Sequence, residues 1–190
     1  MILTMNSKPD RPELINSMRF FPDWDTNSGI SVCGLIEMMY DINELRDGRF
    51  LECVEVGSHK GESGLLMSSF PFIKFIHCVD IHPYEEIHQR LSHKTKNNKV
   101  KIVTDDSNNY AKQIPDKSID MVYIDSAHDF DHVTNDLDTW SKKLKPEGFL
   151  CGHDFRPCWQ GVVKAVENFL EKHNMSLQIY RDGSYMIHWK

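Results

Sequence analysis

Residues 54–63 read VEVGSHKGES, and this stretch decides how the rest of the chain is interpreted. Two β-branched residues flank a carboxylate, Glu55, and lead into glycines at positions 57 and 61. A buried strand that runs into a glycine turn and then a helix is typical of a ligand loop in an open parallel sheet. The glycines let the backbone approach a ligand closely, and the helix directs the positive end of its dipole at the site.

Further short apolar runs have the composition and length of buried strands. Together with 50–56, they lie at 75–79, 100–103, 121–124 and 149–151. Helical patterns lie between and after them, at 130–144 before Pro146 and at 160–174. Another helical stripe (Ile30, Cys33, Ile36 or Glu37, Tyr40) precedes the first run and stops at Gly48. Strands that alternate with helices predict an α/β fold with a mainly parallel sheet covered on both faces.

The C-terminal stretch has a different pattern. Two alternating runs flank Asp182-Gly183, which is a strong signal for a tight hairpin turn. We therefore expect a seven-stranded sheet that ends in an antiparallel hairpin strand. A single domain is expected over 28–190, with residues 1–27 as a separate N-terminal segment that forms a lid, a tail or an oligomer contact.

The composition is that of a water-soluble globular protein with a small-molecule partner. The net charge of -6, from 28 acidic and 22 basic residues, disfavours a nucleic-acid partner because binding there requires neutralised phosphates. No apolar run approaches a membrane span, and the N-terminus lacks the layout of a secretion signal. The five cysteines form no C-x-x-C pair, as expected in a reducing compartment. We expect a cytoplasmic location and leave homo-oligomerisation open.

Two acidic residues indicate the kind of ligand. Asp80 follows the second predicted strand, where a carboxylate can accept both hydroxyls of a ribose. Glu55 replaces the first glycine of the dinucleotide pattern G-x-G-x-x-G and would repel a pyrophosphate. At the end of its strand it would instead face a cation. S-adenosylmethionine meets these demands, since it has a ribose, an ammonium and a sulfonium but no phosphate.

The sequence resembles the class I S-adenosylmethionine-dependent methyltransferases, closest to the small-molecule O-methyltransferases that include macrocin-type sugar methyltransferases. Three blocks carry the resemblance: VEVGSHKGES, CVDIHP at 78–83, and MVYIDSAHDFDHVTNDLDTWSKKLKPEGFLCGHDF at 121–155. It spans roughly residues 28–189 and implies a Rossmann-like three-layer sandwich. It also implies cofactor contacts by Gly57, Ser58, Gly61, Ser63, Asp80, Asp106 and Ser107. The family turn L-K-P-G-G reads LKPEG here, with Glu147 in place of a glycine.

The candidate chemical groups follow two neighbouring strands. Asp125 and His128 follow the fourth strand, and His153 and Asp154 follow the fifth, so parallel strands would bring all four to one rim. A histidine suits removal of a hydroxyl proton during methyl transfer. Asp125 would also border the cofactor, and Asp125 and Asp154 are candidate ligands for Mg²⁺. In the plainer alternative, the aspartates cap turns and His128 orients a loop.

The leading hypothesis is an O-methyltransferase that acts on a small hydroxylated metabolite, such as a sugar or a diol. A nicotinamide-dependent oxidoreductase on a similar sheet is the enzymatic alternative, which Glu55 and the missing glycine oppose. A noncatalytic nucleoside-binding module is the third.

Overall fold

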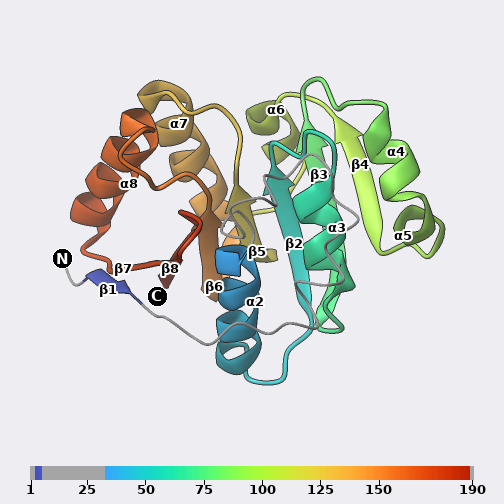
Figure 1. Cartoon of the computed structure of the whole chain (residues 1–190), viewed down its shortest axis with the longest axis horizontal. Coiled ribbons are helices and arrows are strands. Elements are labelled where there is room, and N and C mark those ends of the chain that lie inside the picture. Colours follow the sequence, from blue (N-terminus) through green and yellow to red (C-terminus); the bar gives the residue numbers. More distant parts are fainter. Residues whose placement is uncertain (1–2, 6–32, 189–190) are drawn as a thin grey trace.

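The computed structural model describes residues 3–5 and 33–188 (Figure 1). In this part of the chain, one sheet has the strand order β1-β7-β8-β6-β5-β2-β3-β4. The strands are β1 (Leu3–Met5), β2 (Leu51–Val56), β3 (Ile73–Asp80), β4 (Val100–Thr104), β5 (Ile119–Ile124), β6 (Leu144–Gly152), β7 (Leu177–Ile179) and β8 (Tyr185–His188).

The pairing confirms the predicted fold class. Strands β2 to β6 pair in parallel, whereas β8 is antiparallel to both β6 and β7. These seven strands are the expected set, and the short β1 adds to the edge beside β7. Apart from β1 itself, most of the N-terminal segment 1–27 lies outside the described residues, so its role as lid, tail or oligomer contact stays a prediction.

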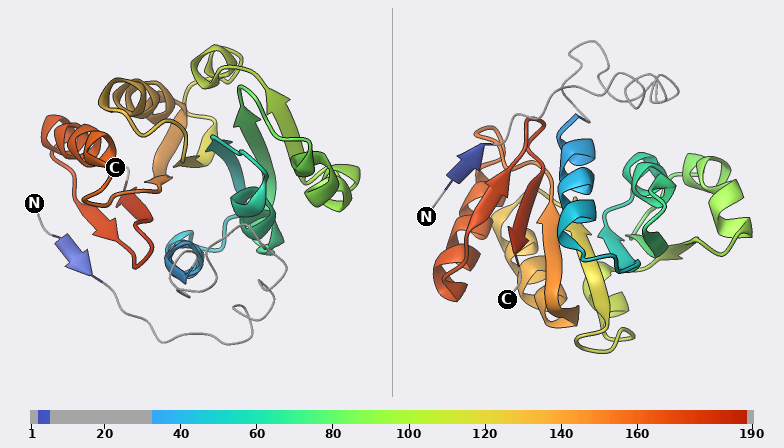
Figure 2. Two further views of the ribbon diagram at one scale, coloured as in Figure 1. Left: turned by 45° about the horizontal axis from the view of Figure 1, so that its top comes forward. Right: turned by 90° about the horizontal axis from the view of Figure 1, so that it is seen from below.

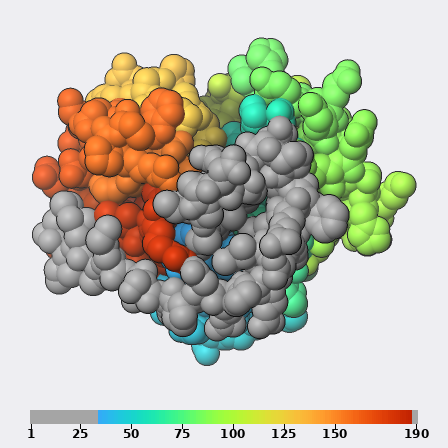
Figure 3. All heavy atoms as spheres, viewed as in Figure 1, coloured from blue at the N-terminus to red at the C-terminus, as the bar shows by residue number. Residues whose placement is uncertain are grey.

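The helices cover both faces of the sheet, as Figure 2 shows. One apolar core lies beneath α2 (Cys33–Leu45), α3 (Glu62–Ser69) and α4 (Glu86–Arg90), with α5 (Ser92–Lys96) next to α4. The other lies beneath α6 (Ser107–Ala111), α7 (Phe130–Trp140) and α8 (Gln160–His173). In the space-filling view, α7 and α8 (yellow to orange) lie at the upper left of the molecule, and α4 and α5 (green) lie at the upper right (Figure 3).

The boundary between α7 and β6 differs from the prediction. The apolar repeat predicted a helix up to residue 144, but α7 ends at Trp140, a short 3-10 turn, η2 (Ser141–Lys143), follows, and Leu144 already pairs with Ile119 of β5. Leu144 is buried as expected, but in the sheet. The four-residue step from Trp140 to Leu144 also fits a chain that leaves a helix and enters a strand, so periodicity alone could not place this boundary.

The predicted stripe of α2 is only part of its buried face, in which Ile36 lies in the core and Tyr40 packs against it. Its most deeply buried residues are Met38, Met39 and Ile42, while Tyr40 is half-buried. Ile30 lies outside the described residues. The hairpin was placed correctly, because β7 and β8 are joined by a turn in which the Gly183 N–H donates to the Tyr180 carbonyl at 3.1 Å. Gly183 has a left-handed φ of 83°, as a turn of this kind requires.

The strand order reverses between β2 and β5. The chain proceeds from β2 to β3 and β4 on one side, and then returns to place β5 and β6 on the other. Ligands of open α/β sheets bind beyond the carboxyl ends of the strands at such a switch point. Within residues 3–5 and 33–188, no helix has both the length and the apolar character needed to cross a membrane.

Candidate functional site

A cavity of about 730 Å³ opens at this switch point. Its wall is formed by residues at and just after the ends of β2, β3, β4, β5 and β6. The sequence-predicted residues that line it are Gly57, Ser58, Ser63, Asp80, Asp106, Ser107, Asp125, His128, His153 and Asp154. Two predicted cofactor residues, Glu55 and Gly61, are not part of its wall.

The glycine loop after β2 has no room for a side chain at its start. Gly57 has a φ of 88°, and a Cβ there would lie 2.1 Å from the Asp125 carbonyl oxygen. The N–H groups of Gly57 and Ser58 both donate to the Val79 carbonyl, at 2.8 and 3.2 Å. The loop is therefore held between β3 and β5, which places its backbone directly at the cavity.

Gly61 lies outside the cavity wall and allows close packing of two helices. It stands at the N-cap of α3 with a φ of 80°, and a Cβ would come within 2.7 Å of Ile87 in α4. The prediction that it lines the ligand site is corrected, because this glycine lets α3 and α4 approach each other. Close by, Arg90 of α4 pairs with Glu62 at 2.5 Å and donates to the Lys60 carbonyl at 2.6 Å, which ties α4 to the same loop.

Asp80 ends β3 at the cavity wall, where the ribose contact was predicted. Its two carboxylate oxygens accept the N–H groups of His59 and His82, both at 2.8 Å. Each oxygen has a further lone pair for a ligand hydroxyl. The aspartate thus fixes the loops on both sides of it and still presents a negative charge to the cavity.

Glu55 faces away from the cavity, contrary to the prediction that it meets the ligand directly. Its side chain is fully buried between β2 and α3, where its carboxylate accepts a hydrogen bond from the Ser63 hydroxyl. A Cβ on Gly64 would lie 2.8 Å from its second oxygen. Burial raises the pKa of Glu55 to about 7. The cavity meets Ser63, so Glu55 reaches the ligand site only through this hydroxyl.

A buried carboxylate on α7 organises the side of the cavity where the adenine contact was predicted. Asp136 accepts hydrogen bonds from Ser107 at 2.6 Å, Asn108 at 3.1 Å and Ser126 at 2.7 Å. Asp136 was not among the site residues predicted from the sequence. Its signal was a charged residue three positions after Val133 and four before Trp140, on the buried face of an amphipathic helix. Asp106 caps α6 by accepting the Asn109 N–H at 2.9 Å.

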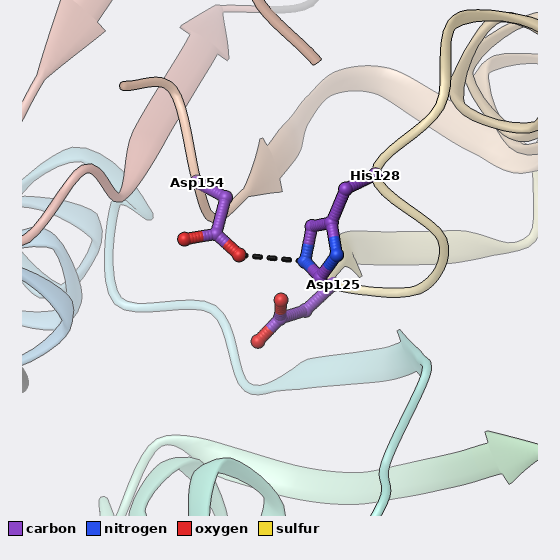
Figure 4. Close-up of side chains that lie close together, drawn as sticks. All are labelled: Asp125, His128 and Asp154. Carbon is purple, nitrogen blue, oxygen red and sulfur yellow. Dashed lines mark ion pairs between the residues drawn. The ribbon is translucent and has the colours of Figure 1, made fainter. Parts of the chain in front are cut away.

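The four candidate chemical groups do meet at one rim, as Figure 4 shows for three of them. His128 Nε2 lies 2.7 Å from Asp154 Oδ2, and His153 Nδ1 lies 3.3 Å from the other Asp154 oxygen. His153 Nδ1 is 3.9 Å from Asp125 Oδ1. Asp154 has a left-handed φ of 60°, which turns its side chain back over the rim. Asp154 therefore bridges two histidines, and the partner of His128 is Asp154.

These groups shift each other's charge states. The hydrogen bond to Asp154 raises the pKa of His128. Burial disfavours a charged His153, but Asp154 and Asp125 outweigh this and raise its pKa to about 9. Burial would raise the pKa of Asp154, yet the two imidazoles hold it well below its usual range. Burial raises the pKa of Asp125 to about 6. The charge state of each group at the rim therefore depends on the charge of its neighbours.

The rim also has the donor geometry of a metal site. One ligand atom each from Asp125, His128 and Asp154 lie within 4.8 Å of one another. Two carboxylate oxygens and one imidazole nitrogen suit a divalent cation. Asp154 is already engaged by His128 and His153, so a bound cation would have to replace these ion pairs.

Comparisons with known proteins agree with this architecture. The chain has 18% identity to a protein of Staphylococcus aureus provisionally designated a caffeoyl-CoA O-methyltransferase, with a TM-score of 0.67 over 93% of this chain and 92% of that one. It has 21% identity to precorrin-6y C5,15-methyltransferase of Geobacter metallireducens (TM-score 0.62; 81% and 88% covered). It has 18% identity to the SAH-bound methyltransferase PaMTH1 of Podospora anserina (TM-score 0.64; 98% and 90% covered).

Such identities establish a shared fold. No curated protein matches the sequence significantly. The model of the methyltransferase domain family, however, matches residues 54–155, which span more than half of the chain and include both the glycine loop and the His128–Asp154 rim. The chain therefore belongs to the methyltransferase domain family and has the fold of S-adenosylmethionine-dependent methyltransferases.

Proposed function

We propose that this protein transfers a methyl group from S-adenosylmethionine to a hydroxyl of a small metabolite, such as a sugar or a diol. The observation that carries the proposal is the 2.7 Å pair of His128 and Asp154 at the edge of the cavity. A base held by a carboxylate is what hydroxyl methylation needs, because the acceptor must lose its proton as it attacks the methyl group.

The donor would lie along the glycine loop. In the proposed arrangement, the ribose hydroxyls donate to Asp80, and the adenine lies on the side of Asp106 and Ser107. The backbone of Gly57 and Ser58 leaves space for the amino-acid part, with Ser63 and the buried Glu55 beneath it. This directs the methyl group toward the rim at the ends of β5 and β6.

The acceptor would enter beside His128. Its oxygen forms the new bond to the methyl carbon while the bond from that carbon to sulfur breaks, so the sulfonium becomes a neutral thioether. His128 Nε2 is engaged by Asp154, and Nδ1 points away from it (Figure 4), so Nδ1 is the nitrogen that takes the acceptor proton. Asp154 stabilises the imidazolium that results, and Asp125 orients the acceptor at the other side of the rim.

A divalent cation such as Mg²⁺ is a second proposal for the same rim, since the donor atoms fit one. Asp125, Asp154 and the His128 nitrogen would hold it, and when bound it would lower the pKa of an acceptor hydroxyl. Because the ion pairs of Asp154 compete with a cation, we expect His128 to act without one. Turnover that is lost in a chelator and restored by Mg²⁺ would reverse this ranking.

The test is a screen of hydroxylated acceptors by mass spectrometry for a gain of one methyl group. With an acceptor in hand, His128→Gln and Asp154→Asn should lower kcat by roughly a hundredfold or more, the usual contribution of a general base, with little change in S-adenosylmethionine affinity. His93→Gln is the matched control, because His93 lies on α5 and pairs with Asn97 away from the cavity. Full activity of both rim variants would refute the assigned roles.

A further inference from the structure

Trp159 is a large aromatic residue in an unfavourable place. It is 40% exposed, and it occupies the N-cap of α8 without any side-chain capping bond. Ser, Thr, Asp and Asn are strongly preferred at this position because their side chains satisfy the free N–H groups of the first turn. A tryptophan gives up this stabilisation and exposes apolar surface. Departures of this kind from local preference are expected where a residue serves function.

The indole contacts one of the proposed chemical groups. Its ring stacks on the imidazole of His128, with centroids 4.1 Å apart and planes inclined by 24°. The cavity wall includes His128 but does not include Trp159, so the indole contacts the imidazole from outside this wall.

His128 needs such a contact. It lies in the irregular segment between β5 and α7, where no regular backbone structure fixes its orientation. The hydrogen bond to Asp154 holds one atom on the edge of the ring but lets the ring swing about that atom. The stack blocks this motion on one face. The backbone is fixed as well, because Gly161 packs against the His128 carbonyl so closely that a Cβ would lie 2.3 Å from its oxygen.

We propose that Trp159 is a positioning residue, which holds the imidazole of His128 by its face in the orientation at which its edge meets Asp154. The expected effect of Trp159 on turnover rests on the proposed function. The stacking of Trp159 on His128 is independent of that function. Reacting groups must be held close to their productive geometry, so loss of the stack should reduce kcat while donor binding is spared.

Two variants separate positioning from structural support. Trp159→Ser removes the stack but introduces a better N-cap, so the melting temperature should stay equal or rise while kcat falls roughly fivefold to tenfold, the scale of one lost aromatic contact. Trp159→Phe keeps a ring and should retain most of kcat. Phe50→Ser is the control, because Phe50 is a 65% exposed aromatic outside the cavity wall, and it should leave kcat unchanged.

The contact between Trp159 and His128 can be measured by NMR from the chemical shifts of the imidazole protons of His128. The signals of these protons are identified as those that disappear from the spectrum of His128→Gln. Stacking on the indole should move them upfield of those of exposed histidines, and Trp159→Ser should abolish this shift. An unshifted His128 in the wild type overturns the proposal, as does wild-type kcat in Trp159→Ser. Equal losses of kcat and melting temperature in both Trp159 variants also overturn it, since they indicate a structural role.

The NMR result is independent of methylation. If no acceptor is methylated by the wild type, the proposed function fails, but the positioning contact is still decided by the presence or absence of the upfield shift. If methylation is found and the upfield shift of the His128 protons is absent, the proposed function is supported and the positioning role of Trp159 is refuted.

Discussion

Glu55 led to a correct prediction of where the site lies, but the predicted direction of its side chain was wrong. A carboxylate within a strand indicated a site at the end of β2, and the cavity does lie there. Its neighbours Val54 and Val56 face the core beneath α6, α7 and α8, so the strand alternation sends Glu55 to the opposite face, where α3 covers it. The carboxylate is therefore a buried support for Ser63.

The burial of Glu55 predicts that the stability of the folded protein depends on pH. The pKa of Glu55 rises from 4.5 to about 7 in the folded protein, so between these values the unfolded chain loses its proton while the folded chain keeps it. Stability then falls as pH rises through this window, by about 3 kcal/mol in total. Glu55→Gln, without cofactor, should match the wild type near pH 4.5 and exceed it at pH 8 in urea unfolding. A stability difference that is the same at both pH values would contradict this.

Asp80 predicts a loss in donor binding. Its carboxylate lines the cavity, and each of its two oxygens accepts one backbone N–H while keeping a lone pair for a ligand. Asp80→Asn should weaken S-adenosylmethionine binding by roughly tenfold to a hundredfold, the scale of charged hydrogen bonds, and Asp80→Ala by more, because it also frees the loops. Isothermal titration calorimetry measures this. Asp116→Asn is the control, since Asp116 is exposed and pairs with Lys143. Unchanged affinity in the Asp80 variants would remove the ribose assignment.

At the scale of elements, β6 carries local strain at Glu147, where the departure from the family pattern was predicted to change little. Glu147 stands where the family turn has a glycine, and it adopts a left-handed φ of 59° while exposed to solvent. A non-glycine residue in this conformation loses stability through the clash of its Cβ with the backbone. The strand is nevertheless formed, because Met121 and Val122 of β5 pair with Phe149 and Leu150 of β6.

Glu147→Gly should therefore stabilise the protein, in contrast to most glycine substitutions. We expect a gain of about 0.5 to 1 kcal/mol, seen as a rise of a few degrees in melting temperature. Glu167→Gly in the middle of α8 is the matched control and should lower stability by about 1 kcal/mol, because there glycine weakens a helix. Destabilisation by both substitutions would show that the turn holds no strain.

At the scale of the whole molecule, donor binding should stabilise the fold, since the cavity joins loops from five strands of one sheet. A ligand present at a hundred times its Kd adds about 2.7 kcal/mol of stability. S-adenosylmethionine should thus raise the melting temperature by roughly 5 to 10 °C, while NAD at the same concentration should not. A shift with NAD alone would favour the oxidoreductase alternative.

Much of this architecture could be predicted from local patterns. Apolar runs located strands β2 to β6, the Asp182-Gly183 turn located the hairpin, and alternation of strands with helices gave the parallel sheet. Because parallel strands end at one edge, Asp125 and Asp154 could be assigned to one rim in advance. Boundaries such as Leu144 could not, since a helix repeat and the start of a strand share the same spacing there.

The sequence by itself determined which residues end the strands, and therefore which side chains gather at the cavity. Only the tertiary structure decided which of them touch: that Glu55 turns inward, that Asp136 holds two serines, and that His128 lies between Asp154 and Trp159. The physical reason is that hydrophobic periodicity is a property of each segment, whereas these contacts join loops far apart in the chain. Their conformations are set by packing between α3, α7, α8 and the sheet.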